Sequence, residues 1–265
     1  MDNDEIRSTV LALIESIAPD AAVQLIRPDQ PLREQIELDS MDWLNVIAAL
    51  HDRFFVEIPA SDHGQLTTLD SIVSYLACRP AQHPGEPLRA MAKAPAPLTC
   101  NHHWVNGASV SVRPIRPDDM QLQADFVRNL STETRYQRFM VTLRELPAAK
   151  LKYLTEVDQL RHVALVATVD HSGQEVVVGV VRYVVNPAGT GCEFALAVDD
   201  AWQGSGLAGI LMHVLMDIAR SRGLATMDGT VLRTNTRMLQ FTRQLGFRQE
   251  RNPDDRDTVR VVRSL

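Results

Sequence analysis

Three places in the sequence hold residues whose types and spacing could do chemistry. Residues 203–208 form a glycine-containing turn between an apolar run that ends at Val198 and a longer apolar stretch. Glu193 stands near the start of that first run, inside Cys-Glu-Phe-Ala-Leu-Ala-Val. Far upstream, Ser40 lies between two acidic positions, directly before a helical pattern. Each place also has a purely structural explanation, so the surrounding elements have to decide.

The glycine turn could bind phosphate. A strand, a turn with Gly204 and Gly206, and a helix N-terminus bring several backbone N–H groups together, and the helix dipole adds positive potential. Glycines carry no side chain, so a diphosphate could approach the backbone there. A tight strand-to-helix turn would need the same two glycines without any ligand. The turn alone therefore leaves both possibilities open.

Glu193 could act as a base, and Ser40 as an attachment point. A carboxylate at Glu193 could remove a proton from an amine directly or through water; the alternative is a solvated glutamate near a strand start. The hydroxyl of Ser40 could be phosphorylated at an exposed helix start. The alternative is an ordinary helix cap that satisfies the free N–H groups of the first turn.

Hydrophobic spacing divides the chain into two parts. Apolar residues recur every three or four positions over 6–17, 44–54 and 69–76, which predicts a small all-α bundle in residues 1–78. From residue 109 the pattern predicts an α/β domain, with strands at 110–115, 162–169, 176–185, 193–198 and 225–233 and helices at 206–220 and 236–245. Five prolines predict a semi-extended linker, placed at 79–108: Pro80, Pro84, Pro87, Pro95 and Pro97.

Charge follows the same division. Residues 1–78 hold fourteen acidic and four basic side chains, a net charge of −10, whereas the rest of the chain carries +4. Two modules of opposite charge are expected to attract each other weakly at low salt. The acidic part lacks the clustered Lys and Arg that phosphate backbones require, so no nucleic acid partner is expected.

Composition limits the remaining classes. No run reaches the 18 apolar residues of a membrane span, and the acidic start lacks the features of a secretory signal. Cys78, Cys100 and Cys192 are scattered, and His102-His103 has no third ligand at a metal-site spacing. We expect a cytoplasmic protein without a metal site or a membrane partner, and we assign the two histidines to the linker.

Residues 1–78 resemble acyl and peptidyl carrier proteins. The resemblance rests on Asp39-Ser40-Met41-Asp42 before the second helix and on Val56-Glu57-Ile58-Pro59 after it. It implies that Ser40 carries covalent 4′-phosphopantetheine, attached by a phosphopantetheinyl transferase, and that the arm holds acyl groups as thioesters. Met41 stands where the family usually has Leu, and the second helix is less acidic than in many carriers.

Residues 109–265 resemble the GNAT superfamily of acyltransferases, in which a mixed central sheet is splayed. Gln203, Gly206 and Ala208 fit its Gln/Arg-x-x-Gly-x-Gly/Ala motif, and Asn235 to Leu239 followed by Leu245-Gly246-Phe247 fits a second motif. The resemblance implies acetyl-CoA or another acyl-CoA in a V between two strands. The implied binding residues are Val198, Gln203, Gly204, Ser205, Gly206, Leu207, Ala208 and Asn235.

Glu193 is the best candidate for the catalytic base, because it starts the strand before the glycine turn. Thr242 occupies the position at which many GNAT enzymes have a tyrosine acid, so that acid is absent. With Glu-Phe-Ala at 193–195 and Arg135 to Phe139, this absence is similar to the bacterial protein-lysine acetyltransferase (Pat) branch. Arg135 to Phe139 could equally be an amphipathic helix wall.

Three functions remain open from the sequence. The leading hypothesis is an N-acyltransferase that moves an acyl group between a thioester and an amine, with the arm on Ser40 holding donor or acceptor. The acceptor could be a small molecule, a carrier-bound amino acid or a protein lysine. The alternatives are a protein-lysine acetyltransferase with a regulatory, unmodified bundle and a non-catalytic sensor of acyl-CoA.

Overall fold

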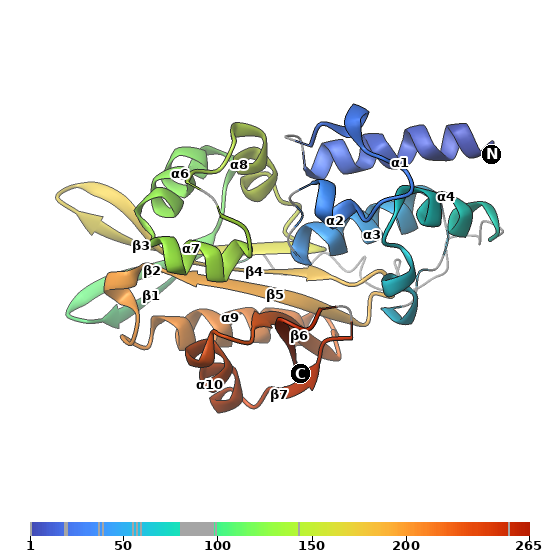
Figure 1. The fold of residues 1–265 in the computed structure, drawn as a ribbon. Coiled ribbons are helices and arrows are strands. Elements are labelled where there is room, and N and C mark those ends of the chain that lie inside the picture. Colours follow the sequence, from blue (N-terminus) through green and yellow to red (C-terminus); the bar gives the residue numbers. More distant parts are fainter. Residues whose placement is uncertain are drawn as a thin grey trace. The chain divides into compact units, whose positions relative to one another are not determined.

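The computed structural model describes residues 2–18, 21–36, 38, 40–54, 56, 58, 60–79, 98, 100–142, 144–253 and 255–265. The chain divides into two compact units, a helical N-terminal unit and a C-terminal unit built on a sheet. Figure 1 labels the elements of both. Within the described residues, no helix combines the length and the apolar character needed to cross a bilayer.

The N-terminal unit is a small helical bundle. Its helices are α1 (Asn3–Ile17), α2 (Leu32–Gln35), α3 (Ser40–Phe54) and α4 (Leu69–Ala77), with 3₁₀ turns at Val23–Leu25 and Ala60–Gln65. The predicted stripes form the core, since Ile14, Ile47 and Ile72 from three helices are fully buried. Thr68 caps α4 through a capping box with Ser71.

The C-terminal unit contains one mixed sheet. Its described strands are β1 (Asn101–Val105), β2 (Ala108–Pro114), β3 (His162–His171), β4 (Gln174–Val185), β5 (Gly191–Val198), β6 (Thr226–Leu232), β7 (Arg248–Arg251) and β8 (Thr258–Ser264). Their order across the sheet is β1-β2-β3-β4-β5-β6-β8-β7. The pair β5–β6 is parallel, and the other neighbouring strands are antiparallel.

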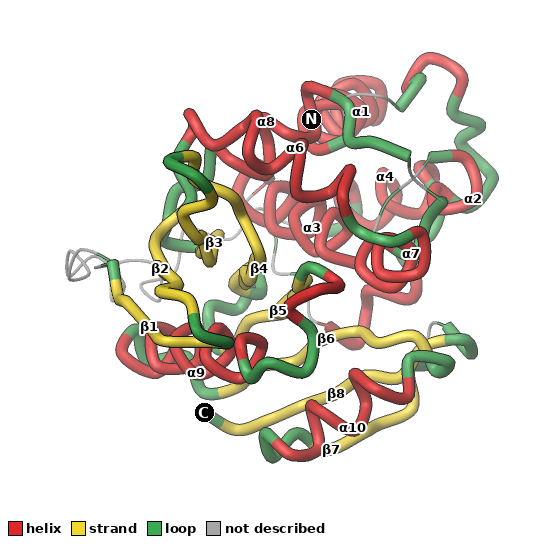
Figure 2. Tube along the Cα trace, turned by 90° about the vertical axis from the view of Figure 1, so that its left-hand side faces the viewer, coloured by secondary structure: helices red, strands yellow, loops and turns green. Residues whose placement is uncertain are grey.

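Helices cover both faces of this sheet (Figures 1 and 2). On one face lie α6 (Met120–Asn129), α7 (Thr132–Phe139) and α8 (Ala148–Thr155), and on the other lie α9 (Leu207–Ser221) and α10 (Thr236–Gln244). Gly179 on β4 lets α9 approach closely, because an added Cβ would lie 2.9 Å from Leu211 Cδ1 and 3.5 Å from Leu207 Cδ2. This packing fixes the start of α9 against the sheet.

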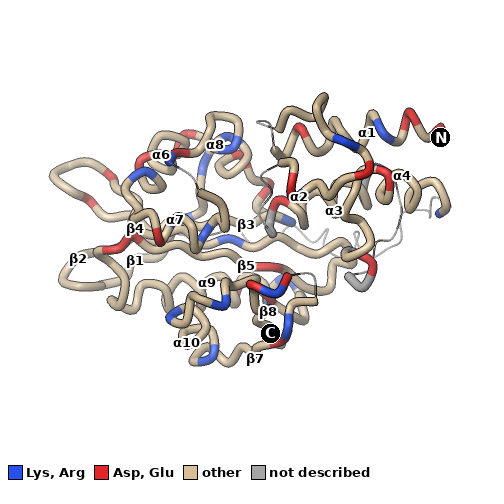
Figure 3. The backbone as a smooth tube through the Cα atoms, in the orientation of Figure 1, with Lys and Arg blue, Asp and Glu red and all other residues tan. Residues whose placement is uncertain are grey.

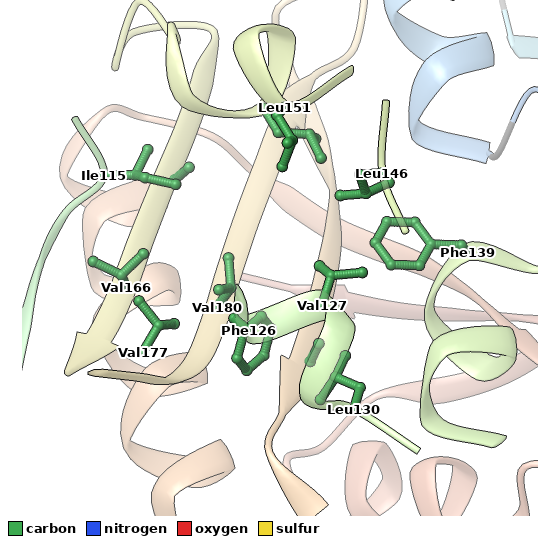
Figure 4. Packing of buried hydrophobic residues seen from close by; sticks show 13 residues of the cluster. Ile115, Phe126, Val127, Leu130, Phe139, Leu146, Leu151, Val166, Val177 and Val180 are labelled. Carbon is green, nitrogen blue, oxygen red and sulfur yellow. The ribbon is translucent and has the colours of Figure 1, made fainter. Parts of the chain in front are cut away.

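The core beneath α6, α7 and α8 joins helices to the central strands. Figure 4 shows Phe126, Leu130 and Phe139 from the helical layer packed with Val166 and Val180 from the sheet. Phe139 closes α7 as part of this core, so the stretch from Arg135 to Phe139 is a helix with one buried side. The sheet face that carries Ala197 of β5 is therefore held rigid by the helical layer.

The predicted linker extended too far toward the C-terminus. Residues 80–97 and 99, with all five linker prolines, lie outside the described residues. Residues 101–105, however, form β1 and pair with β2 through a two-residue turn at Asn106-Gly107, where φ is +50° and +76°. Positive φ at both turn positions matches the twist of a hairpin. His102 and His103 thus belong to a strand and not to a linker.

Candidate functional site

The centre of the site is a fork between β5 and β6. The two parallel strands pair only at Gly191 to Glu193 with Thr226 to Asp228, although β5 continues to Val198 and β6 to Leu232. Beyond Glu193 the strands are no longer partners. The fork therefore opens toward the C-terminal ends of both strands, which is the predicted splay of the sheet.

The open edge of β5 presents backbone groups to this fork. The N–H of Asp199 donates to the carbonyl of Val178 on β4, at 3.0 Å. Because successive residues of a strand point their N–H groups to opposite sides, the N–H of Val198 faces away from β4, toward the fork. The N–H of Val198 is therefore positioned to pair with an extended ligand chain in the fork.

In the turn at 203–208, every second backbone N–H group is bonded within the turn. Gly204 and Gly206 have φ values of +79° and +90°, which side-chain-bearing residues rarely adopt. The N–H groups of Gln203, Ser205 and Leu207 bond inside the turn, to Asp200 O, Trp202 O and Ser205 Oγ respectively.

The other N–H groups of the turn are free for a ligand. Within the fully described stretch 203–209, no protein acceptor bonds the N–H groups of Gly204, Gly206, Ala208 or Gly209. These groups are at the N-terminus of α9, where the helix dipole is positive. Among the six predicted binding positions, Gly204, Gly206 and Ala208 are thus the ones whose N–H groups have no protein acceptor, a distinction that the motif did not contain.

A hydrogen-bond network from the N-terminus of α7 supports the turn. Asp200 accepts from the N–H and Oγ of Ser131, both at 2.8 Å, and from Thr134 Oγ1 at 2.7 Å. Burial alone would raise the pKa of Asp200, but these hydrogen bonds outweigh it and hold the pKa below its ordinary value. Asp200 is therefore ionised at neutral pH and ties the N-terminus of α7 to the turn.

Glu193 lies at the apex of the fork. Asp228 is its partner across the parallel pair, so both side chains leave the same face of the sheet. Thr230 Oγ1 donates to Glu193 Oε1 at 3.2 Å, and Arg260 Nε donates to Asp228 Oδ2 at 3.1 Å. These contacts orient the carboxylate of Glu193 in a half-buried position.

Glu193 lies upstream of the open edge of β5. Glu193 and Val198 are five residues apart on this strand, which corresponds to about 16 Å at ~3.3 Å per residue. A chain that extended along β5 from Val198 to Glu193 would therefore cover about 16 Å.

Cys192, beside Glu193, is not a nucleophile. Its side chain is fully buried, on the opposite sheet face from that of Glu193. Burial, followed by the negative charges of Asp228 and Glu193, raises the pKa of the thiol far above its ordinary value. The thiol stays protonated at neutral pH, and thiols attack only as thiolates.

The floor of the fork is aromatic. Phe194 and Phe247 are buried, with ring centroids 5.2 Å apart. Gly229 on β6 makes room for Phe194, because a Cβ there would lie 2.6 Å from the ring. The Leu-Gly-Phe motif of the sequence thus contributes its phenylalanine to packing under the site.

Asn235 and Thr242, two positions near the second motif, also have structural roles. Asn235 caps α10, since its Oδ1 accepts from the N–H of Met238 at 3.0 Å. Thr242 is fully buried, and its hydroxyl donates to the carbonyl of Leu239 at 3.1 Å. The hydroxyl of Thr242 therefore points into packing and cannot replace the missing tyrosine.

A buried polar pair lies farther along the face that carries Glu193. Arg182, with 2% of its surface exposed, donates from Nη1 to Leu154 O and to Nε2 of His162, both at 3.2 Å. Burial first, and then the charge of Arg182, lowers the pKa of His162 well below its ordinary value. His162 is therefore neutral, with the proton on Nδ1. No sequence motif indicates this pair.

The carrier site is described less fully than the fork. Ser40 is the first residue of α3, as predicted for an attachment serine at a helix start. Asp39 lies outside the described residues. Asp42 is buried, so its side chain faces the interior of the bundle. Among the described residues, no group of three or more His, Cys, Asp or Glu could hold a metal ion.

Comparison with known proteins identifies both units. The family model "Acetyltransferase (GNAT) family" matches residues 125–247, and "Phosphopantetheine attachment site" matches residues 8–76. An acetyltransferase of Pseudomonas aeruginosa is 35% identical over 59% of this chain and 87% of its own length. The acyl carrier protein of Streptomyces coelicolor is 35% identical over 28% of this chain and 76% of its own length.

Relatives named Pat match the C-terminal unit. The acetyltransferase Pat of Mycolicibacterium smegmatis is 32% identical over 51% of this chain, which corresponds to 40% of that protein. The crystal structure of the GNAT domain of S. lividans PAT superposes with a TM-score of 0.57 and 27% identity, over 63% of this chain and 97% of that domain.

The splayed sheet, the glycine turn and both sequence matches agree. Acyl transfer from acetyl-CoA or another acyl-CoA to an amine is the chemistry of this family. The phosphopantetheine attachment region lies in the same chain, ahead of the transferase. The chain therefore belongs to the GNAT acetyltransferase family and carries an acyl-carrier domain N-terminal to its catalytic domain.

Proposed function

We propose that this protein is an N-acyltransferase in which Glu193 is the catalytic base and Ser40 carries the pantetheine arm that takes part in the transfer. The observation that carries the proposal is the fork itself. It places a carboxylate at the apex of the splayed strands and open N–H groups at the other end.

The reaction balances with these groups. The amine nitrogen attacks the thioester carbonyl, the carbon–sulfur bond breaks, and an amide forms. Glu193 accepts the proton that the nitrogen loses, and the departing thiolate takes up one proton to leave as a thiol. A thiolate leaves without a strong acid, which accounts for a buried threonine at position 242.

The arm gives the carrier unit its role. A phosphopantetheinyl transferase would transfer phosphopantetheine from CoA to Ser40, and the arm would then hold either the acyl group or the amine that receives it. The position of Ser40 at the start of α3 supports this assignment. A carrier fused to a transferase presents its cargo at high local concentration.

The attachment is tested by intact-protein mass spectrometry. The full chain is incubated with CoA and a broad-specificity phosphopantetheinyl transferase, alongside Ser40→Ala and the matched control Ser8→Ala from the exposed side of α1. We expect the wild type and Ser8→Ala to gain one phosphopantetheine and Ser40→Ala to gain none. An equal gain in Ser40→Ala would place the arm elsewhere.

A second function is favoured by the likeness to the GNAT domain of PAT. In that case a protein lysine is the acceptor and the carrier unit is regulatory. Acetyl-lysine formation on added proteins that is unchanged in Ser40→Ala would support it. Activity that needs the modified Ser40 would support the carrier-linked reaction.

A further inference from the structure

We propose that Arg237 makes the fork selective for acyl groups carried by free CoA over acyl groups carried by a pantetheine arm. This inference rests on the proposed acyl transfer at the fork and deepens it. Free acyl-CoA is then the donor, and the arm on the carrier unit presents the amine acceptor. The direction that the sequence left open is thereby assigned.

The guanidinium of Arg237 is positioned beside the glycine turn. Arg237 is the second residue of α10, and its Nη1 donates to Gln203 Oε1 at 2.7 Å. Its Nη2 lies 3.8 Å from where a Cβ would stand on Gly204. The cation therefore lies against the backbone of the turn, next to the amides that have no protein acceptor.

Chemistry fixes the orientation of Gln203. Its Nε2 donates to Val198 O at 3.3 Å and to Thr134 Oγ1 at 3.2 Å, so its Oε1 points toward Arg237. The flipped amide would place one carbonyl oxygen against another and an NH₂ group against a cation. Gln203 thus holds Arg237 in place without neutralising its charge.

The guanidinium of Arg237 also contributes to the positive electrostatic potential around the turn. α10 carries two arginines and no acidic residue, and Figure 3 shows the basic colouring along this helix. Asp200, the nearby carboxylate, is occupied by Ser131 and Thr134. The side of the turn that faces α10 is therefore positive, through the guanidinium and through the N-terminus of α9.

The two candidate ligands differ in the phosphates that they bring. The arm has one phosphodiester, bonded to serine, with a single negative charge. CoA has a diphosphate and a 3′-phosphate. The amides of Gly204, Gly206 and Ala208 can satisfy one phosphate of either ligand. The second phosphate of the diphosphate exists only in CoA, and an arginine fork is the side chain best suited to bind it.

A purely structural role for Arg237 makes a different prediction. If the guanidinium only braced Gln203 and the turn, its removal would weaken binding of CoA and of phosphopantetheine by the same factor. If it binds the second phosphate, removal weakens only the ligands that contain a diphosphate. The ratio of the two affinities separates the two roles.

The test is titration calorimetry on the full chain with three probes: CoA, 3′-dephospho-CoA and 4′-phosphopantetheine. The variants are Arg237→Ala and Arg237→Lys. The matched control is Arg243→Ala, on the same helix, whose side chain contacts Gln249 at 3.5 Å. Circular dichroism of each variant confirms that it folds.

We expect Arg237→Ala to weaken both CoA and 3′-dephospho-CoA about tenfold or more, the size of a charge-assisted hydrogen bond, and to leave phosphopantetheine within about twofold. Arg237→Lys keeps the charge and should lose less. Arg243→Ala should match the wild type for all three probes.

Other results would overturn the inference in identifiable ways. Equal weakening of all three probes assigns Arg237 a structural role. If only the binding of CoA is weakened, Arg237 contacts the 3′-phosphate and the argument about the diphosphate fails. A wild-type chain that binds none of the probes would contradict the proposed function itself, whereas CoA binding that is insensitive to Arg237→Ala contradicts only this inference.

Discussion

At the scale of single residues, the site depends on one carboxylate whose surroundings are polar on one side and apolar on the other. Glu193 is contacted by Thr230, and the next residue of the strand, Phe194, packs on Phe247. The alternation of a strand separates these two environments, because successive side chains leave opposite faces. A base can therefore be half exposed while its neighbour is part of the core.

The carboxylate of Glu193 should be required for turnover but not for binding. Glutamine keeps the size and the acceptor oxygen toward Thr230 but cannot take up the proton. We expect Glu193→Gln to lower kcat by about 10²–10⁴-fold, the range of general-base catalysis, with little change in the dissociation constant of CoA. Steady-state kinetics and CoA titration check this. An unchanged kcat would show that Glu193 is not the base, whereas CoA binding without turnover in the wild type would leave a non-catalytic acyl-CoA sensor as the better account.

His162 should make the transferase unit sensitive to acid. Its pKa is lowered in the folded state by burial and by Arg182, so the unfolded chain binds a proton first as pH falls below ~6.5. Stability contributed by the neutral imidazole is therefore complete above that pH and is lost below it, by up to ~1.4 kcal/mol per pH unit.

The check is urea unfolding of the wild type and of His162→Phe at pH 7.5 and 5.5, followed by circular dichroism. Phenylalanine cannot titrate, so the variant should lose less stability between the two pH values, even if it is less stable at both. The same loss in both proteins would show that other groups cause the acid sensitivity.

At the scale of elements, close approaches at glycine set the geometry of the fork. Gly179 brings α9 onto β4, and Gly229 admits the ring of Phe194 beneath β6. Neither position has a positive φ, so the requirement is for space and not for backbone conformation. Both glycines are in strands, where they would ordinarily weaken the sheet.

Gly229→Ala should disturb the floor of the fork. The new methyl group would lie 2.6 Å from the Phe194 ring, so the ring or the strand must move, at a cost of about 1–3 kcal/mol in unfolding free energy. Gly209→Ala is the matched control, because its Cβ meets nothing within 4 Å and alanine favours helix. Thermal unfolding compares them; a Gly229→Ala protein as stable as Gly209→Ala would contradict the packing argument.

At the scale of the whole molecule, the fusion determines how cargo reaches the fork. α4 ends at Ala77 and β1 begins at Asn101, so the connecting chain can span at most about 80 Å when fully extended. Within that reach the arm stays at roughly millimolar local concentration. Residues 1–78 carry a net charge of −10 and the rest of the chain carries +4.

Transfer to an amine on the arm should therefore be intramolecular. With an aminoacyl group on the Ser40 arm and acetyl-CoA at saturation, the first-order rate should not change when the protein is diluted from about 10 µM to about 0.1 µM, since both lie far below millimolar. Quenched-flow sampling with mass spectrometry measures this rate. A rate that fell in proportion to concentration would show transfer between molecules.

Local patterns in the sequence predicted both units and the strand and helix periods, because each depends on neighbours within a few positions. Asn106-Gly107 is also a sequence signal for a hairpin turn. It was not recognised because the polar residues His102 and His103 looked like part of the linker. The linker boundary was wrong for that reason.

Tertiary structure decided the rest. Which amides of the turn are open, the hold of Gln203 on Arg237, and the pairing of Arg182 with His162 all join residues about 20 or more positions apart or depend on which side of a strand a group faces. Sequence spacing determines which elements form. Only the packing of β5, β6, α9 and α10 against one another brings the carboxylate of Glu193, the open amides of the glycine turn and the guanidinium of Arg237 into one candidate site.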